Sequence, residues 1–134
     1  GSLKLSPISC ELTYGLERIA MYLQEKKSVF DITWNDGVKY GDIHLEDERQ
    51  FSTFNFKKAD PKTQRELFSI YQREAKRLLS LSLFLPAYDY ILKCSHTFNL
   101  LDSLKSISVG ERTDYIAQIR ELARGCAARY LESV

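Results

Sequence analysis

Apolar and polar residues alternate at the start of the chain, and a helical spacing replaces this alternation after Gly15. The alternation is typical of a half-buried strand and runs through Ile8, Cys10, Leu12 and Tyr14. The next apolar residues recur at the spacing of one helical face, at Leu16, Ile19, Ala20 and Leu23. The sequence therefore predicts a strand that turns at a glycine directly into a helix.

Two short β-prone runs follow this helix. They are Val29–Trp34 and Val38–Gly41, and the turn residues Asn35-Asp-Gly37 lie between them. This arrangement predicts a β-hairpin. The stretch 46–56 is predicted to be a short helix or irregular, and we expect its aromatic side chains, Phe51, Phe54 and Phe56, to anchor it onto a core.

The second half of the chain shows three helical patterns. Asp60-Pro61 is a strong helix start, and the apolar face that follows predicts a helix to about Leu81. A second helix is predicted to begin at Pro86, and a third begins at a capping box, Ser108-Val-Gly-Glu111. Three amphipathic helices joined by short links predict a compact bundle.

The composition is that of an ordinary globular domain, with 44% hydrophobic and 28% charged residues and a net charge of +1. No strong whole-chain field directs the chain to nucleic acid or membrane. No apolar run approaches the ~20 residues that cross a bilayer, and the first residues do not resemble a signal peptide. The three widely spaced cysteines favour reduced thiols in the cytoplasm, with Cys94 and Cys126 packed on apolar helix faces. No histidine or cysteine spacing suits zinc.

Candidate chemistry gathers where the predicted strand meets the predicted helix. Glu11, Thr13, Glu17 and Arg18 lie within a few residues of Gly15. Backbone N–H groups and the positive end of the helix dipole meet at such a junction, which suits phosphate binding. Gly15 would let the backbone turn or approach a ligand closely. From the residues alone, however, a solvated arginine in a first helical turn explains Arg18 better.

The run Gly15-Leu-Glu-Arg18 after an alternating strand resembles motif 3 of the class II aminoacyl-tRNA synthetases. Nearly the whole chain resembles the alpha chain of the bacterial two-subunit glycyl-tRNA synthetase. The segments that carry this resemblance keep the family's order: Leu5–Gln24, Phe51–Phe56 with Ala59-Asp60, Leu85–Tyr90, Ser95–Asp102 and Ile107–Arg112. One departure is Cys10, where relatives often have glycine.

The resemblance implies ATP-dependent activation of glycine to glycyl-adenylate and its transfer to tRNA(Gly), with ATP and Mg²⁺ at the site. Arg18 would then be the catalytic arginine that contacts the ATP phosphates, and Gly15 would lie against the nucleotide. Glu11 is the expected carboxylate for ATP-bound Mg²⁺ or for the ammonium group of glycine; the alternative is an exposed strand residue. Thr13 and Tyr14 are expected to line the glycine pocket.

The family's motifs 1 and 2 are not found in these 134 residues, so the resemblance implies the C-terminal part of a longer alpha chain. We expect the strand at residues 8–14 to pair with a missing portion of the protein, with a symmetry mate, or with the hairpin at residues 30–42. We also expect the 134 residues alone to form no glycyl-adenylate.

The expected fold is mainly α: a remnant of a class II synthetase antiparallel sheet, followed by a three-helix bundle. The expected domains are residues 1–45, with motif 3 and the hairpin, and residues 46–134, which are helical. Expected partners are the beta subunit, a second alpha chain and tRNA(Gly), in the cytoplasm. A second interpretation is a non-catalytic helical module that docks onto the beta subunit or another protein.

Overall fold

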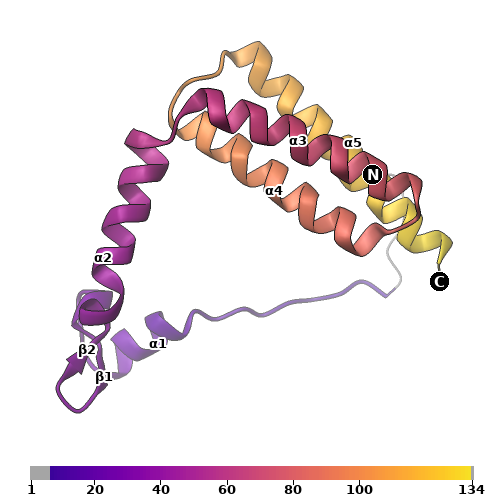
Figure 1. Cartoon of the computed structure of the whole chain (residues 1–134). Helices are drawn as coiled ribbons and strands as arrows, with labels where there is room; N and C mark the ends of the chain where they lie inside the picture. Colours follow the sequence, from indigo (N-terminus) through magenta and orange to yellow (C-terminus); the bar gives the residue numbers. More distant parts are fainter. Residues whose placement is uncertain (1–6, 134) are drawn as a thin grey trace. The chain divides into compact units, whose positions relative to one another are not determined.

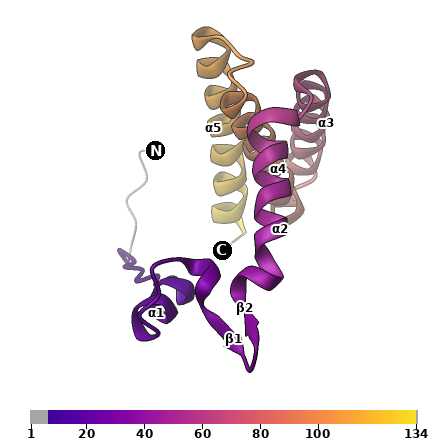
Figure 2. The ribbon, with the colours of Figure 1, turned by 90° about the vertical axis from the view of Figure 1, so that its left-hand side faces the viewer.

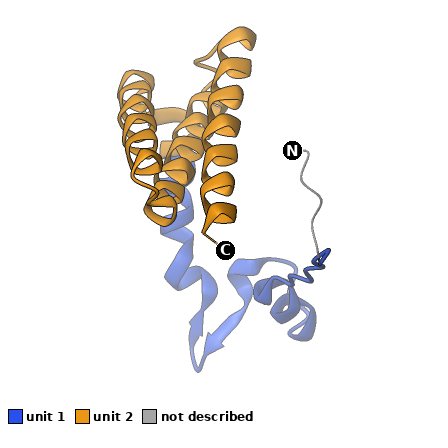
Figure 3. Ribbon diagram, turned by 90° about the vertical axis from the view of Figure 1, so that its right-hand side faces the viewer, with its two compact units in different colours: residues 1–53 blue, residues 54–134 orange. Residues whose placement is uncertain are grey.

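The structure is a computed structural model that describes residues 7–133. The chain divides into two compact units, Gly1–Thr53 and Phe54–Val134 (Figure 3). Leu5 and Ser6, which belong to the first resembling segment, lie outside the described residues. The expected domain boundary after residue 45 falls inside a helix of the first unit, and as a functional boundary it stays a prediction.

The first unit contains two helices, a turn of 3₁₀ helix and a hairpin (Figures 1 and 2). Its elements are α1 (Leu16–Leu23), η1 (Val29–Asp31), β1 (Thr33–Asn35), β2 (Val38–Lys39) and α2 (Tyr40–Thr53). β1 and β2 pair antiparallel around Asp36-Gly37, where Gly37 has a φ of 85° that favours glycine. The predicted helix and hairpin are therefore confirmed, although the strands are shorter than the β-prone runs.

The predicted strand at residues 8–14 does not form in this chain. These residues run without helix or strand into α1, and the only sheet among the described residues is the β1–β2 pair (Figure 1). The apolar side chains of Ile8, Leu12 and Tyr14 are 87%, 79% and 74% exposed. A strand needs a hydrogen-bonding partner, and the expected pairing with the hairpin at residues 30–42 is wrong for the described residues.

The prediction that three aromatic residues anchor residues 46–56 onto a core is also wrong. Phe51, Phe54 and Phe56 are 66%, 41% and 60% exposed. Phe54 and Phe56 lie in the π-helical turn η2 (Phe54–Lys58) at the start of the second unit, whereas Phe51 lies in the first unit, on α2, which starts earlier than predicted. Among the described residues of the first unit, Ile32 alone is buried. So short a stretch encloses almost no core of its own.

The second unit contains the predicted three-helix bundle, formed by α3 (Pro61–Ser80), α4 (Phe84–Ser103) and α5 (Val109–Glu132) (Figure 1). The Asp60 carboxylate caps α3 by accepting from the Thr63 N–H at 2.9 Å. The Ser108–Glu111 capping box at the start of α5 is present as predicted. α4 begins slightly before Pro86, which therefore occupies its first turn, where a missing N–H costs nothing.

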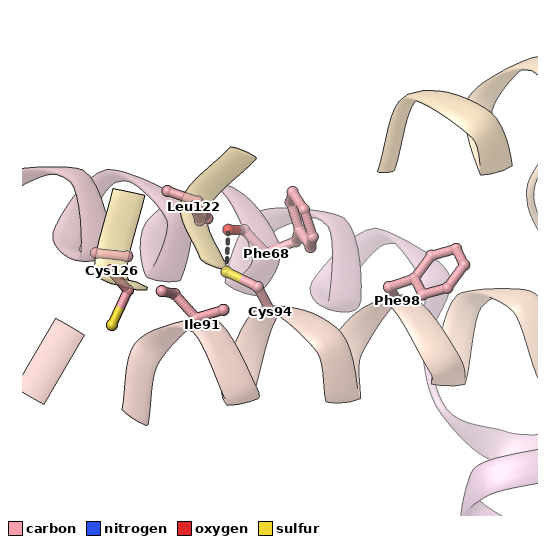
Figure 4. Close-up of a cluster of buried hydrophobic side chains, with 7 residues drawn as sticks. Phe68, Ile91, Cys94, Phe98, Leu122 and Cys126 are labelled. Carbon is pink, nitrogen blue, oxygen red and sulfur yellow. Dashed lines mark hydrogen bonds between the residues drawn. The ribbon is translucent and has the colours of Figure 1, made fainter. Parts of the chain in front are cut away.

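The core of the bundle takes residues from all three helices (Figure 4). Its buried members are Phe68, Ala75, Ile91, Cys94, Phe98, Leu122 and Cys126. The predicted packing of Cys94 and Cys126 is therefore confirmed. The Cys94 Sγ lies 3.9 Å from the Phe68 carbonyl oxygen, and burial raises the pKa of this thiol to about 11. The expected fold class, mainly α with a short hairpin and a helical bundle, is confirmed.

Candidate functional site

The candidate site lies at the start of α1, where Arg18 is the third helical residue. Its side chain is exposed and makes no ion pair with any residue of the range 7–133. Glu17 places a carboxylate in the same first turn, at the positive end of the helix. No residue of α1 is buried, and Leu16 and Leu23 are 77% and 74% exposed. Arg18 is thus presented to solvent by a helix that packs very little.

The extended segment before α1 brings two of the predicted site residues together. The Thr13 hydroxyl donates a hydrogen bond to the Glu11 carboxylate. Side chains two residues apart in an extended chain point the same way, which brings these two together. Tyr14 is exposed and forms no hydrogen bond within the part of the chain that the structure describes. The structure therefore joins Glu11 with Thr13, and it leaves Tyr14 apart from them.

Gly15 is the N-cap residue of α1 and has an ordinary extended backbone, with φ −73° and ψ 122°. Any residue can adopt this conformation. A Cβ atom added here would meet nothing closer than the Glu17 carboxylate, 3.9 Å away. The turn interpretation of this glycine is therefore not needed, since neither its backbone conformation nor the neighbouring atoms of residues 7–133 require glycine at the position.

Two contacts that the sequence did not predict hold α1 to the rest of the unit. The Gln24 side chain donates to the Thr33 carbonyl at 3.0 Å and accepts from the Thr33 N–H at 2.7 Å. The Tyr40 hydroxyl donates a long hydrogen bond to the Glu17 carboxylate, at 3.5 Å. Partial burial and then the Glu17 carboxylate raise the pKa of Tyr40. Both partners are distant in sequence, and no local signal marks them.

A shallow, mostly apolar pocket of about 240 Å³ lies between α1 and the hairpin. It is lined by Leu16, Glu17, Ala20, Gln24, Ile32, Thr33, Trp34 and Tyr40. Arg18, Glu11 and Thr13 do not line it, so the candidate phosphate site and this pocket are separate features of α1.

The family model described as "Glycyl-tRNA synthetase alpha subunit" matches residues 1–134, the whole of the chain. The chain belongs to the glycyl-tRNA synthetase alpha subunit family. The resemblance inferred from the segments around Gly15-Leu-Glu-Arg18 is thereby confirmed at the level of the family. Membership makes the chain a component of an aminoacyl-tRNA synthetase, a ligase that serves translation and uses ATP.

Few groups of the candidate site could bind a metal ion. No group of three or more histidine, cysteine, aspartate or glutamate residues among residues 7–133 could hold a metal ion. The Glu11 carboxylate is exposed and offers oxygen donors, the kind that Mg²⁺ prefers. One carboxylate together with substrate phosphates is a common way to hold this ion.

No helix that the structure describes is long and apolar enough to span a membrane.

Proposed function

We propose that this chain is the motif 3 part, and the helical domain, of the catalytic alpha subunit of glycyl-tRNA synthetase. The complete enzyme would activate glycine with ATP and transfer it to tRNA(Gly) in the cytoplasm. The observation that supports this most concerns Arg18 in a chain of this family: its exposed guanidinium lies in the first turn of α1 and forms no ion pair with any of residues 7–133.

In the activation step, a carboxylate oxygen of glycine attacks the α-phosphorus of ATP. The bond to the bridging oxygen breaks, and pyrophosphate leaves with the electron pair. Positioning and charge stabilisation carry such a reaction. Arg18 binds the phosphate oxygens through its planar guanidinium, which stays charged and can bind two oxygens at once. The first N–H groups of α1 add donors beside it.

The residues before α1 are assigned to the nucleotide and to glycine. The open space beside Gly15 supports close approach of the nucleotide to the backbone, because among residues 7–133 only the Glu17 carboxylate comes within 4 Å of an added Cβ atom, at 3.9 Å. Glu11, held by the Thr13 hydroxyl, would bind the glycine ammonium or a Mg²⁺ ion. That ion, when bound, neutralises charge on the phosphate oxygens. Thr13 and Tyr14 would line the glycine pocket. Glu17 supports the turn that carries Arg18.

These residues need a larger frame in order to act. Apolar and polar residues alternate along the extended segment 8–14, and its backbone and apolar side chains have no partner among residues 7–133. This supports pairing of the segment, as a strand, with another part of the catalytic domain or with another chain. The family's motifs 1 and 2 are not among the 134 residues. The isolated 134-residue chain should therefore give no glycine-dependent pyrophosphate exchange, and exchange above background would refute this.

Replacement of Arg18 in the complete enzyme tests the assignment. We expect Arg18→Ala to lower pyrophosphate exchange by roughly a hundredfold or more, the loss seen when one donor to developing charge is removed. Arg18→Lys keeps the charge but not the planar guanidinium that can bind two oxygens, so it should retain only part of the exchange activity. The matched control is Arg49→Ala, an exposed arginine of α2 paired with Glu46 at 3.8 Å. Full exchange activity in a folded Arg18→Ala enzyme would overturn the assignment.

The second proposed role, docking onto the beta subunit, is favoured by one face of the bundle. A groove of about 260 Å³ runs between α4 and α5, lined by Phe84, Leu85, Tyr88, Ala123, Cys126, Ala127 and Tyr130. Leu85 at its edge is 74% exposed. Leu85→Glu in the alpha chain should weaken assembly with beta in analytical ultracentrifugation. Val109→Glu is the control, at another exposed apolar position whose side chain is 84% exposed. Unchanged assembly in Leu85→Glu would exclude this face.

A further inference from the structure

The helix that presents Arg18 cannot fix its own direction. α1 has eight residues, none of them buried, and no side chain caps its first turn. A helix this short is not stable alone in water. The helix cannot continue past its C-cap residue Gln24, because the next residue, Glu25, has a positive φ of 53°. Among residues 7–133, the direction in which Arg18 points therefore depends on the few contacts between α1 and the rest of the first unit.

The strongest of these contacts is made by Gln24 at the C-terminal end of α1. Its amide group pairs with both backbone groups of Thr33, at 3.0 and 2.7 Å, as a neighbouring strand would. Thr33 in turn pairs with Lys39 in the hairpin. The side chain therefore ties the helix to the first strand of the hairpin by two hydrogen bonds of good length.

A second and weaker contact lies at the N-terminal end of the same helix. The Tyr40 hydroxyl reaches the Glu17 carboxylate, next to Arg18. The backbone N–H of Tyr40 also donates to the Ile32 carbonyl at 2.8 Å, so the hairpin and the start of α2 move as one piece. Gln24 and Glu17 lie seven residues apart, about 10 Å along a helix at 1.5 Å per residue. Two attachments that far apart define the direction of the helix axis.

We propose that Gln24 is a positioning residue for ATP binding: by clasping Thr33 it sets the orientation of α1 and hence the place of the Arg18 guanidinium. This inference rests on the proposed function of Arg18. Tyr40 supplies the second attachment. Gln24 touches neither the nucleotide nor glycine and acts only through the helix that it ends.

The test uses pyrophosphate exchange by the complete enzyme. Gln24→Met removes both hydrogen bonds and keeps a similar length and a high helix propensity. We expect kcat/KM for ATP to fall by roughly ten- to a hundredfold, the scale of a misplacement by about 1 Å. KM for glycine should change less than twofold. The matched control is Gln50→Met, because Gln50 is an exposed glutamine of α2 whose amide donates to the Glu46 carboxylate one helical turn away, at 3.0 Å.

A double-mutant cycle separates positioning from general weakening. Once Arg18 is alanine, its place no longer matters, so Gln24→Met should cost less than twofold in that background. Equal losses in both backgrounds, or no loss in either, would overturn the inference while leaving the role of Arg18 intact. An Arg18→Ala enzyme with full activity would refute the proposed function and this inference with it.

Gln24→Asn is a second test, in case Gln24→Met does not fold. It keeps the amide chemistry, but it is one methylene too short to reach Thr33 from the same helix end. We expect it to lose as much kcat/KM for ATP as Gln24→Met, with unchanged helix content in circular dichroism. Full activity in Gln24→Asn would contradict the inference even if Gln24→Met failed to fold.

Discussion

Replacing Gly41 with alanine should loosen the first unit, because an added methyl group would overlap the backbone of Phe30. Gly41 is the second residue of α2, and it lies against the η1 turn. A Cβ atom here would stand 2.8 Å from the Phe30 carbonyl oxygen and 3.0 Å from its Cβ. The first of these is a backbone atom, so a change of side-chain rotamer cannot relieve the overlap.

The size of the effect follows from this geometry. Non-bonded carbon atoms prefer separations of about 3.5–4.0 Å, so η1 and α2 would have to separate by roughly half an ångström. Overpacking of this kind costs about 1–3 kcal/mol. Alanine regains up to about 1 kcal/mol through its higher helix propensity. We therefore expect a net loss of about 1–2 kcal/mol, a five- to thirtyfold rise in the unfolded population of this unit.

Trp34 is the natural probe for this measurement. It is the only tryptophan of the 134 residues, and its ring lies 6.0 Å from that of Tyr40 and 6.3 Å from that of His44. Urea unfolding followed by Trp34 fluorescence should show a lower midpoint in Gly41→Ala, whereas circular dichroism reports mainly on the bundle. Gly110→Ala is the control, since the nearest atom to its added Cβ would be 4.0 Å away. An unchanged or higher fluorescence midpoint in Gly41→Ala would show that Phe30 does not pack against α2.

Three further predictions concern the site and the bundle. Gly15→Ala should leave the free energy of unfolding within about 0.5 kcal/mol, as surface changes do, yet raise KM for ATP in the complete enzyme; an unchanged KM would contradict close approach of the nucleotide. The Ser108 backbone N–H and then the Arg65 guanidinium hold the pKa of Glu111 at about 2, below its ordinary 4.5. The ionised Glu111 therefore stabilises the folded bundle above pH 4.5, and this contribution is lost as the pH falls toward 2. Glu111→Gln should therefore flatten the acid dependence of helix content in circular dichroism, and parallel curves for the two proteins would refute this. In the 134-residue chain one thiol, Cys10, should react quickly with a disulfide reagent at pH 8, because Cys94 with a pKa of about 11 is only about one part in a thousand thiolate; more than one fast thiol would contradict the burial.

The sequence predicted the bundle well because its signals are local. The Asp60 cap, the Ser108–Glu111 capping box and the recurring apolar positions act within a few residues of chain, and the structure contains all of them. The turn at Asp36-Gly37 is local in the same sense, and so is the family motif at Gly15-Leu-Glu-Arg18. Such signals depend on residues that are close in sequence, so they do not require a particular distant partner.

Features that depend on distant partners were decided by the tertiary structure alone. The alternation of residues 8–14 predicts a strand, but a strand exists only where another strand accepts its hydrogen bonds, and residues 7–133 provide none. Phe51 has a large apolar side chain that would suit a core, but it stays exposed because the first unit has almost no core. The clasp of Gln24 on Thr33 joins two polar residues that no periodicity connects. By itself the sequence determined α1, the three helices of the bundle, the caps of α3 and α5, and the family. Only the folded chain decided how far α2 extends and how α1 is held, because both depend on which distant groups come within reach.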